Sequence, residues 1–262
     1  MTVDPLLPVK LVAVPVLVLA ASLAARRWGP SVGGFVIGLP LTSGPVLVFL
    51  ALEQGVGFAS SAAVSTLLGV VPLSVYCLTY ARAAFRFGWR ATLALSTMVY
   101  FAIAAVLSQV DTLAVVGLGA ALTTILASLY LMPRSRGETS ERPLPRWEIL
   151  ARIVAATSLV ILITEGASLL GPRWSGLLAP YPIYATVFAV FMHRFDGPTS
   201  SGPFLRGVVA SALSSSAFFF TFSSTVLPLG IAISAILALS ATVLVQGTML
   251  FAGAGLWRDG DR

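Results

Sequence analysis

The chain has 262 residues, of which 57% are hydrophobic and only 10% charged, and its formal net charge is +6. Soluble domains usually carry about 25% charged residues, so this composition excludes an ordinary water-soluble domain. The apolar stretches approach the roughly 20 residues that a helix needs to cross a membrane, and they lack the short alternating segments of a barrel. The composition predicts an all-α integral membrane protein.

Nine apolar stretches follow one another along the chain, and each predicts one transmembrane helix. One clearly hydrophilic linker, residues 133–147, interrupts the series. The predicted spans are 6–25, 33–53, 57–81, 91–109, 111–132, 148–170, 174–193, 204–224 and 228–256.

The basic residues give these spans an orientation. With nine spans, one side of the membrane receives all of them except Lys10 and Arg173. By the positive-inside rule that side is cytoplasmic, so we expect a multi-pass protein of the bacterial inner membrane with its N-terminus outside and its C-terminus inside. The arginines form no aromatic-interleaved basic face, which speaks against nucleic acid as a partner.

The two halves of the chain resemble each other. A shift of 142 residues superposes the first two predicted spans on the sixth and seventh without a gap. The matches predict a first four-helix repeat over 1–110, a linker helix and cytoplasmic loop over 111–147, and a second, inverted four-helix repeat over 148–262. Inverted repeats are common in secondary transporters; a duplication kept for stability alone is the alternative. Matching pairs include Gly29/Gly171, Pro30/Pro172, Gly34/Gly176, Pro40/Pro182 and Gly55/Gly197.

Two of the spans carry matching interruptions. Prolines and glycines gather at 38–45 in the second span and prolines at 179–184 in the seventh. Each proline removes a backbone donor and clashes with the preceding turn, so both helices should break. Pro40 and Pro182 each lie about seven residues into their spans. Both breaks are therefore expected in the middle third of the bilayer. Paired interruptions of this kind point to a transporter's binding site, whereas simple proline kinks are the structural alternative.

The residues at the two breaks are the predicted substrate-binding residues. A helix start at Thr42 or Ser43, with Pro45 in its first turn, would present N–H groups and a positive dipole end to an anionic group. Two tyrosines would add an apolar wall edged with hydroxyls. The predicted set is Pro40, Thr42, Ser43, Gly44, Tyr181, Pro182 and Tyr184.

Other polar residues within the spans have both functional and structural interpretations. Glu165 is the one acidic residue well inside an apolar run, and an intramembrane carboxylate is a candidate for proton or ion coupling; an interfacial position is the alternative. The serines of 204–224 favour helix packing over cavity lining. Cys77 and His193 are best explained as structural residues. We find no catalytic or metal-binding constellation, so neither an enzyme nor a cofactor is expected.

The segment SGLLAPYPIYATVFAVFMHRFDG (175–197), continuing into LRGVVASALSSSAFFF, resembles the GlpM family of small bacterial inner-membrane proteins. The shared features are the Gly176-Leu177-Leu178 start, Pro182 with flanking aromatics and the polar turn ending at Gly197. The family's members are short and carry about one repeat, so this chain departs from the family by fusing two. The resemblance implies a membrane location and no substrate.

These observations favour a secondary transporter that moves a small polar solute, anionic or zwitterionic, by alternating access. Two alternatives stay open: a non-transporting membrane subunit or assembly factor, and a flippase for lipids or lipid-linked molecules. The expected partners are the lipid bilayer and a small-molecule or lipid-linked substrate, and a homodimer is left open.

Overall fold

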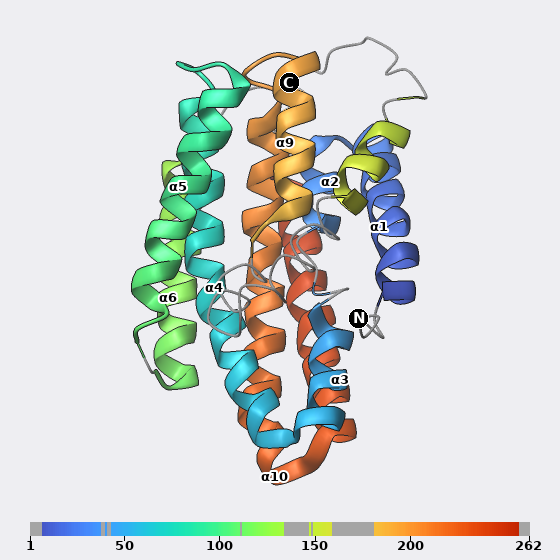
Figure 1. Cartoon of the computed structure of the whole chain (residues 1–262), viewed down its shortest axis with the longest axis vertical. Coiled ribbons are helices and arrows are strands. Elements are labelled where there is room, and N and C mark those ends of the chain that lie inside the picture. Colours follow the sequence, from blue (N-terminus) through green and yellow to red (C-terminus); the bar gives the residue numbers. More distant parts are fainter. Residues whose placement is uncertain are drawn as a thin grey trace, which may run out of the picture.

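The computed structural model describes residues 7–37, 40, 43–110, 112–133, 147, 149–158 and 181–256. These residues form helices and connecting turns, without strands in the described ranges, so the predicted all-α class is confirmed. Figure 1 shows the helices packed side by side in one bundle. They are α1 (Leu7–Trp28), α2 (Pro30–Ile37), α3 (Ser43–Gln54), α4 (Val56–Ala83), α5 (Trp89–Leu107), α6 (Ala114–Leu131), α9 (Ile183–Phe195), α10 (Ser201–Leu256) and an unlabelled helix, Ile149–Ser158.

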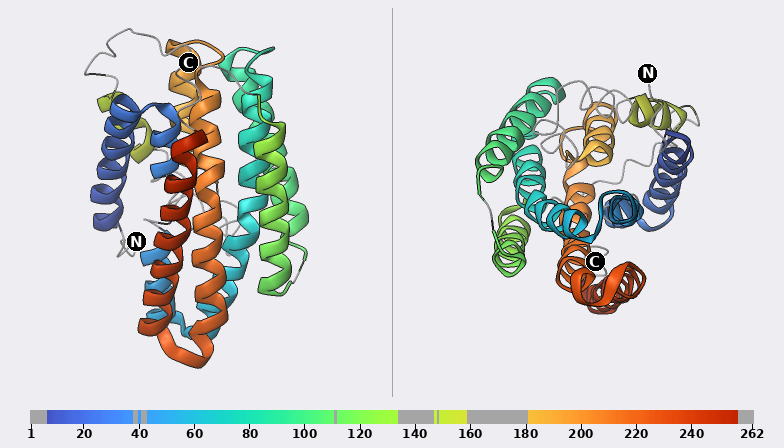
Figure 2. Two further views of the ribbon diagram at one scale, coloured as in Figure 1. Left: turned by 180° about the vertical axis from the view of Figure 1, so that it is seen from behind. Right: turned by 60° about the horizontal axis from the view of Figure 1, so that its bottom comes forward.

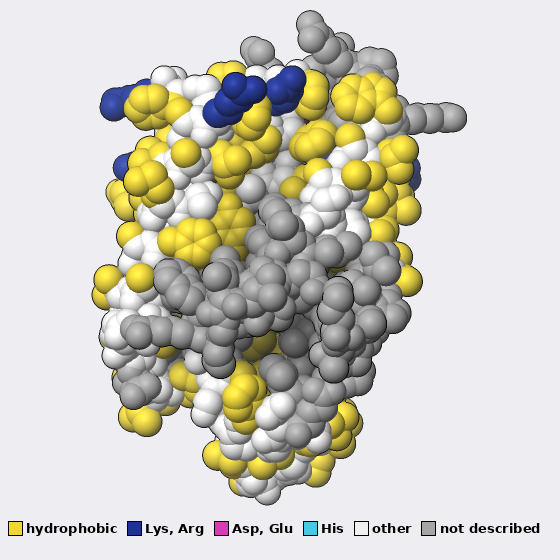
Figure 3. Space-filling view, in the orientation of Figure 1, with side chains coloured by type: hydrophobic (Ala, Val, Ile, Leu, Met, Phe, Trp, Pro, Cys, Tyr) yellow, Lys and Arg dark blue, Asp and Glu magenta, His cyan; other side chains and the backbone are white. Residues whose placement is uncertain are grey.

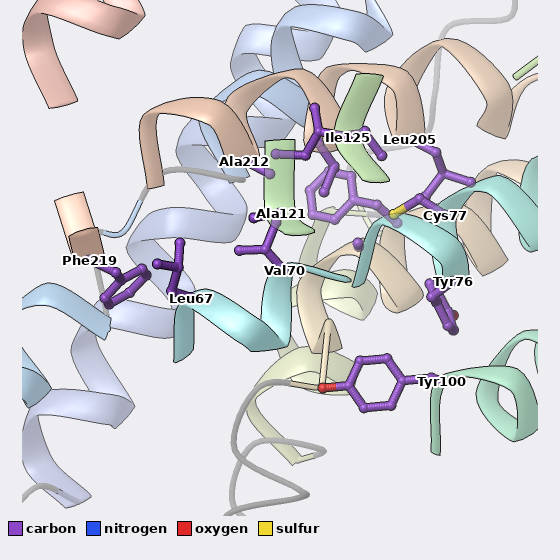
Figure 4. Packing of buried hydrophobic residues seen from close by; sticks show 14 of the residues in the cluster. Leu67, Val70, Tyr76, Cys77, Tyr100, Ala121, Ile125, Leu205, Ala212 and Phe219 are labelled. Carbon is purple, nitrogen blue, oxygen red and sulfur yellow. The ribbon is translucent and has the colours of Figure 1, made fainter. Parts of the chain in front are cut away.

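The core of the bundle lies where α4, α6 and α10 meet. Leu67 and Val70 of α4, Ala121 and Ile125 of α6, and Leu205 of α10 are all buried there (Figure 4). Lipid tails are as apolar as these side chains, so burial from water contributes little to holding such helices together. Close packing and interhelical hydrogen bonds do so instead. One such bond runs from the Ser60 hydroxyl of α4 to the Ser223 carbonyl of α10, at 3.0 Å.

Helix α10 is two antiparallel helices joined by a tight turn. At Gly230 the backbone adopts φ 76° and ψ 176°, a conformation that is essentially restricted to glycine. Figure 2 shows the chain turning there and running back beside the first half. The Ser214 hydroxyl reaches the Gln246 side-chain oxygen across the two halves, at 2.5 Å. The predicted spans 204–224 and 228–256 are therefore the two arms of this hairpin.

Helix α2 packs closely between α1 and α10, and its adjacent glycines, Gly33 and Gly34, permit this close packing. A Cβ on Gly33 would stand 2.6 Å from the Cβ of Ala25 in α1. A Cβ on Gly34 would collide with the carbonyl oxygen of Phe204 in α10, and one on Gly207 with the carbonyl oxygen of Ser31 in α2. Only glycine permits so close an approach of two helix backbones. Gly34 therefore serves the packing of α2 against α10.

The outer surface of the bundle is apolar, as a membrane-embedded surface would be. Large side chains such as Met98 of α5 (69% exposed) and Leu113 just before α6 (75%) project outwards. In water such a surface would promote association. Among the described residues, four helices are long and apolar enough to cross a membrane: α4, α5, α6 and the kinked α10.

The prediction of nine continuous spans is not supported. The stretch 33–53 is divided into two short helices, because prolines and glycines interrupt it. The last two spans are the two arms of the α10 hairpin, and helices at the sixth and seventh spans are described only over Ile149–Ser158 and Ile183–Phe195. Residue 148 and residues 159–180, which include Glu165, lie outside the described residues.

Basic side chains gather at one end of the bundle. Arg26 and Arg27 lie in the last turn of α1, Arg82 in that of α4 and Arg194 in that of α9, where a cation stabilises the negative end of the helix dipole. On the face drawn in Figure 3, lysine and arginine side chains are confined to the upper part. The guanidinium of Arg82 also donates to the Leu131 carbonyl at the end of α6, at 3.0 and 3.1 Å.

Candidate functional site

The break predicted in the second span is present in the structure. Helix α2 ends at Ile37 and α3 begins at Ser43, with buried Pro40 in a bend between them. The N–H of Gly44 donates to the Pro40 carbonyl at 2.9 Å, and Pro45 lies in the first turn of α3. The expected helix start is thus confirmed. Thr42 and the Ser43 side chain lie outside the described part of the chain.

Gly44 lies against an aromatic group of α10. A Cβ there would stand 3.2 Å from the Cζ atom of Phe218, so the glycine lets α3 approach that ring. The Phe218 ring is buried, packs edge-on to Phe219 with centroids 5.3 Å apart and stacks on Phe222 at 6.3 Å. Gly44 therefore packs against a phenyl ring, and its N–H is already used within the chain.

Helix α9 starts within two residues of the position that the 142-residue shift pairs with the start of α3. Buried Pro182 is its N-cap residue, and its carbonyl accepts a hydrogen bond from the Thr186 N–H at 2.9 Å. Figure 1 shows that this start and the gap between α2 and α3 both lie near mid-height of the bundle. From there α3 and α9 run towards opposite ends. Each helix thus directs its N-terminus, the positive end of its dipole, towards the middle layer.

Tyr181 lies just before α9 with its ring inserted among side chains of α4 and α5, which we call the aromatic box: Tyr76, Thr97, Tyr100 and Phe101. The Tyr181 ring stacks on Phe101 with centroids 5.7 Å apart and an interplanar angle of 2°. It meets Tyr76 and Tyr100 edge-to-face at 5.9 and 5.3 Å. Its hydroxyl shares a hydrogen bond of 2.9 Å with Thr97.

The hydroxyls around the aromatic box are unevenly satisfied. Tyr76 shares a 2.8 Å hydrogen bond with Thr186 of α9. The side chains of Tyr80 and Tyr100 are fully buried, and their hydroxyls have no hydrogen-bond partner among the described residues. Leaving such a group unpaired costs about 1–3 kcal/mol. Tyr80 also packs edge-on to His193, the only histidine, with ring centroids 6.0 Å apart.

The predicted binding residues form two groups that lie at a similar level. Pro40 and Gly44 lie at the α2–α3 break, whereas Tyr181 lies at the start of α9 among residues of α4 and α5. No contact described for Gly44 reaches Tyr181. Tyr184 is half-buried and packs on the hydrophobic core.

Sequence reasoning missed Tyr76, Tyr80 and Tyr100. A signal was present, because Tyr76 and Tyr80 are four residues apart and therefore share one face of a helix. Together with Tyr181, these residues account for four of the chain's six tyrosines. Their convergence depends on α4, α5 and α9 meeting, which no local pattern reveals.

The serines of α10 support the packing interpretation. The hydroxyls of Ser211, Ser214 and Ser216 are buried and donate to carbonyls one turn earlier in their own helix, at 2.7–2.9 Å. Free Cys77 is buried in the core. Among the described residues, no group of three or more His, Cys, Asp or Glu side chains could hold a metal ion.

Comparison with family models, with curated proteins and with solved structures finds no match to this chain. The resemblance to the GlpM family therefore rests on the residues that carry it in the sequence.

Proposed function

We propose that the chain is a secondary transporter of the bacterial inner membrane that moves a small polar, anionic or zwitterionic solute by alternating access. One observation carries this proposal: two helices, α3 and α9, begin near mid-height of the bundle and direct their N-termini towards the same layer. Each N-terminus is equivalent to roughly half a positive charge. Packing of an apolar bundle does not require two positive helix ends at that depth. Binding of a solute with a negative group would use them.

An inverted repeat would explain why the two helix starts correspond. The 142-residue shift places residues 183–195 of α9 on 41–53, close to α3 at Ser43–Gln54. Gly55 and Gly197, also 142 residues apart, both follow these helices with positive φ angles of 89° and 100°. The two helices run in opposite directions, as inversion requires. In alternating access, one repeat would rock against the other around a site between them.

The orientation of the chain can be measured directly. We expect the arginine-rich end of the bundle to be cytoplasmic, so a reporter active only in the cytoplasm should work when fused after Arg262. A reporter active only outside the cytoplasm should work at Met1. Both ends on one side would exclude an odd number of crossings and the inverted repeat with it.

Transport itself is tested with the full chain in lipid vesicles. A solute identified by its thermal stabilisation of the purified protein should accumulate inside the vesicles. We propose that Glu165 couples this uptake to protons, so Glu165→Gln should abolish uptake driven by a pH gradient while the stabilisation by solute persists. Unchanged pH-driven uptake would remove Glu165 from the mechanism. Stabilising solutes that never enter the vesicles would favour a non-transporting subunit, and stabilisation by lipids alone a flippase.

A further inference from the structure

We propose that the aromatic box is the binding site for an organic ammonium group, and that Tyr181 occupies this site in the present structure. The inference rests on the proposed function in one respect, since it identifies the cargo as a zwitterion. Its carboxylate end would face the N-terminus of α9, and its ammonium end would replace the Tyr181 ring.

The composition of the aromatic box suits a cation. Three aromatic rings from two helices surround the Tyr181 ring at centroid distances of 5.3–5.9 Å. A cation within about 6 Å of an aromatic centroid is attracted by the negative face of the ring, most strongly where water is excluded. The face of Phe101 that Tyr181 now covers could take such a cation.

One hydroxyl of the aromatic box, that of Tyr100, is buried without a partner among the described residues. Figure 4 shows this hydroxyl pointing away from α5, the helix that carries it. Tyr181 meets the Tyr100 ring but uses its own hydroxyl on Thr97. An ammonium group that carries N–H donors would satisfy the Tyr100 oxygen, and a quaternary one would still gain the ring contacts.

The aromatic box lies beside the positive end of a helix dipole. Tyr181 directly precedes Pro182, the N-cap residue of α9. A ligand that displaced the Tyr181 ring would have one end in the box and the other near the first turn of α9. Separating a positive from a negative group over a short distance is the charge pattern of an amino acid or a betaine. Such a solute is neutral overall, which lowers the cost of holding its charges away from water.

Binding to purified full-length protein tests this assignment. Tetramethylammonium and glycine betaine should both bind, as measured by calorimetry, whereas propionate should bind more weakly than the betaine. Phe101→Leu should weaken tetramethylammonium binding about tenfold, because it removes the stacked face. The matched control is Phe85→Leu, whose ring is half-exposed at the end of α4, and it should leave the affinity unchanged.

The Tyr181 ring competes with the ammonium group for the aromatic box, and this competition gives a sharper test. Tyr181→Phe keeps the stacking but loses the hydrogen bond to Thr97, so the ring should leave more readily and tetramethylammonium should bind about three- to tenfold more tightly. Tyr130→Phe, on the exposed face of α6, is its control. If tetramethylammonium does not bind, or binds equally to wild type, Phe101→Leu and Tyr181→Phe, the assignment is wrong. Ammonium binding without any uptake into vesicles would support the site in the aromatic box and contradict the transport function. Uptake of a purely anionic solute without ammonium binding would contradict the site in the aromatic box and leave the transport function standing.

Discussion

Leucine at Gly34 or at Gly207 should prevent the chain from accumulating as a folded protein. At this crossing, α2 and α10 touch through their backbones. A Cβ on Gly34 would overlap the Phe204 carbonyl, and one on Gly207 would overlap the Ser31 carbonyl. No side-chain rotation relieves a clash with a carbonyl oxygen, so the helices would have to separate. We expect a loss at or above the upper end of the usual cost of overpacking, about 3 kcal/mol, which is a large part of a typical protein's stability.

The measurement is the yield and melting temperature of the detergent-solubilised protein. Gly119→Leu and Gly247→Leu are matched controls, because a Cβ at either helical position meets nothing within 4 Å. Both should be produced at wild-type levels and melt normally. If Gly34→Leu melts as wild type does, α2 cannot lie against α10 as described.

The local features of the fold were predictable from sequence because glycine and proline act locally. The break around Pro40 and the helix start at Ser43 follow from missing backbone donors and from ring clashes. The sequence predicts the boundary between the last two spans at 225–227, a few residues before the turn at Gly230, but it does not show that the chain reverses there with almost no loop. Glycine is the residue type that permits such a positive φ, but the chain has 23 glycines, and the sequence does not show which of them adopts it.

The long-range parts of the site could not be predicted. The aromatic box joins residues of α4 and α5 to Tyr181, which lies about 80 to 105 positions further along the chain. Each of these residues has an ordinary interpretation within its own helix. The crossing of Gly34 and Gly207 has the same limitation, because small residues permit close packing without specifying the partner. The breaks indicate where a site could lie, and the packing of distant helices decides its composition.

The start of α3, at the break in the second predicted span, offers few free backbone N–H groups. Four N–H groups are normally free at the start of a helix. Here the Gly44 N–H already donates to the Pro40 carbonyl, and Pro45 has no N–H. Fewer backbone donors are therefore available to a solute than a regular helix start would offer. We infer that the hydroxyls of Thr42 and Ser43 make up the difference.

Thr42→Val combined with Ser43→Ala should then weaken solute binding about ten- to a hundredfold, since each hydrogen bond to a charged group contributes about 1.5–3 kcal/mol and part of that is recovered through water. The matched control is the adjacent pair Thr66→Val with Ser65→Ala on α4, whose hydroxyls donate to carbonyls of their own helix at 2.8 and 3.0 Å. Calorimetry gives the affinity of each double variant, and melting shows whether it remains folded. An equal loss of affinity in both pairs would reduce the effect to general destabilisation. Unchanged affinity in the Thr42 and Ser43 variant would place the solute elsewhere, because no other hydroxyl pair adjoins the start of α3 in the sequence.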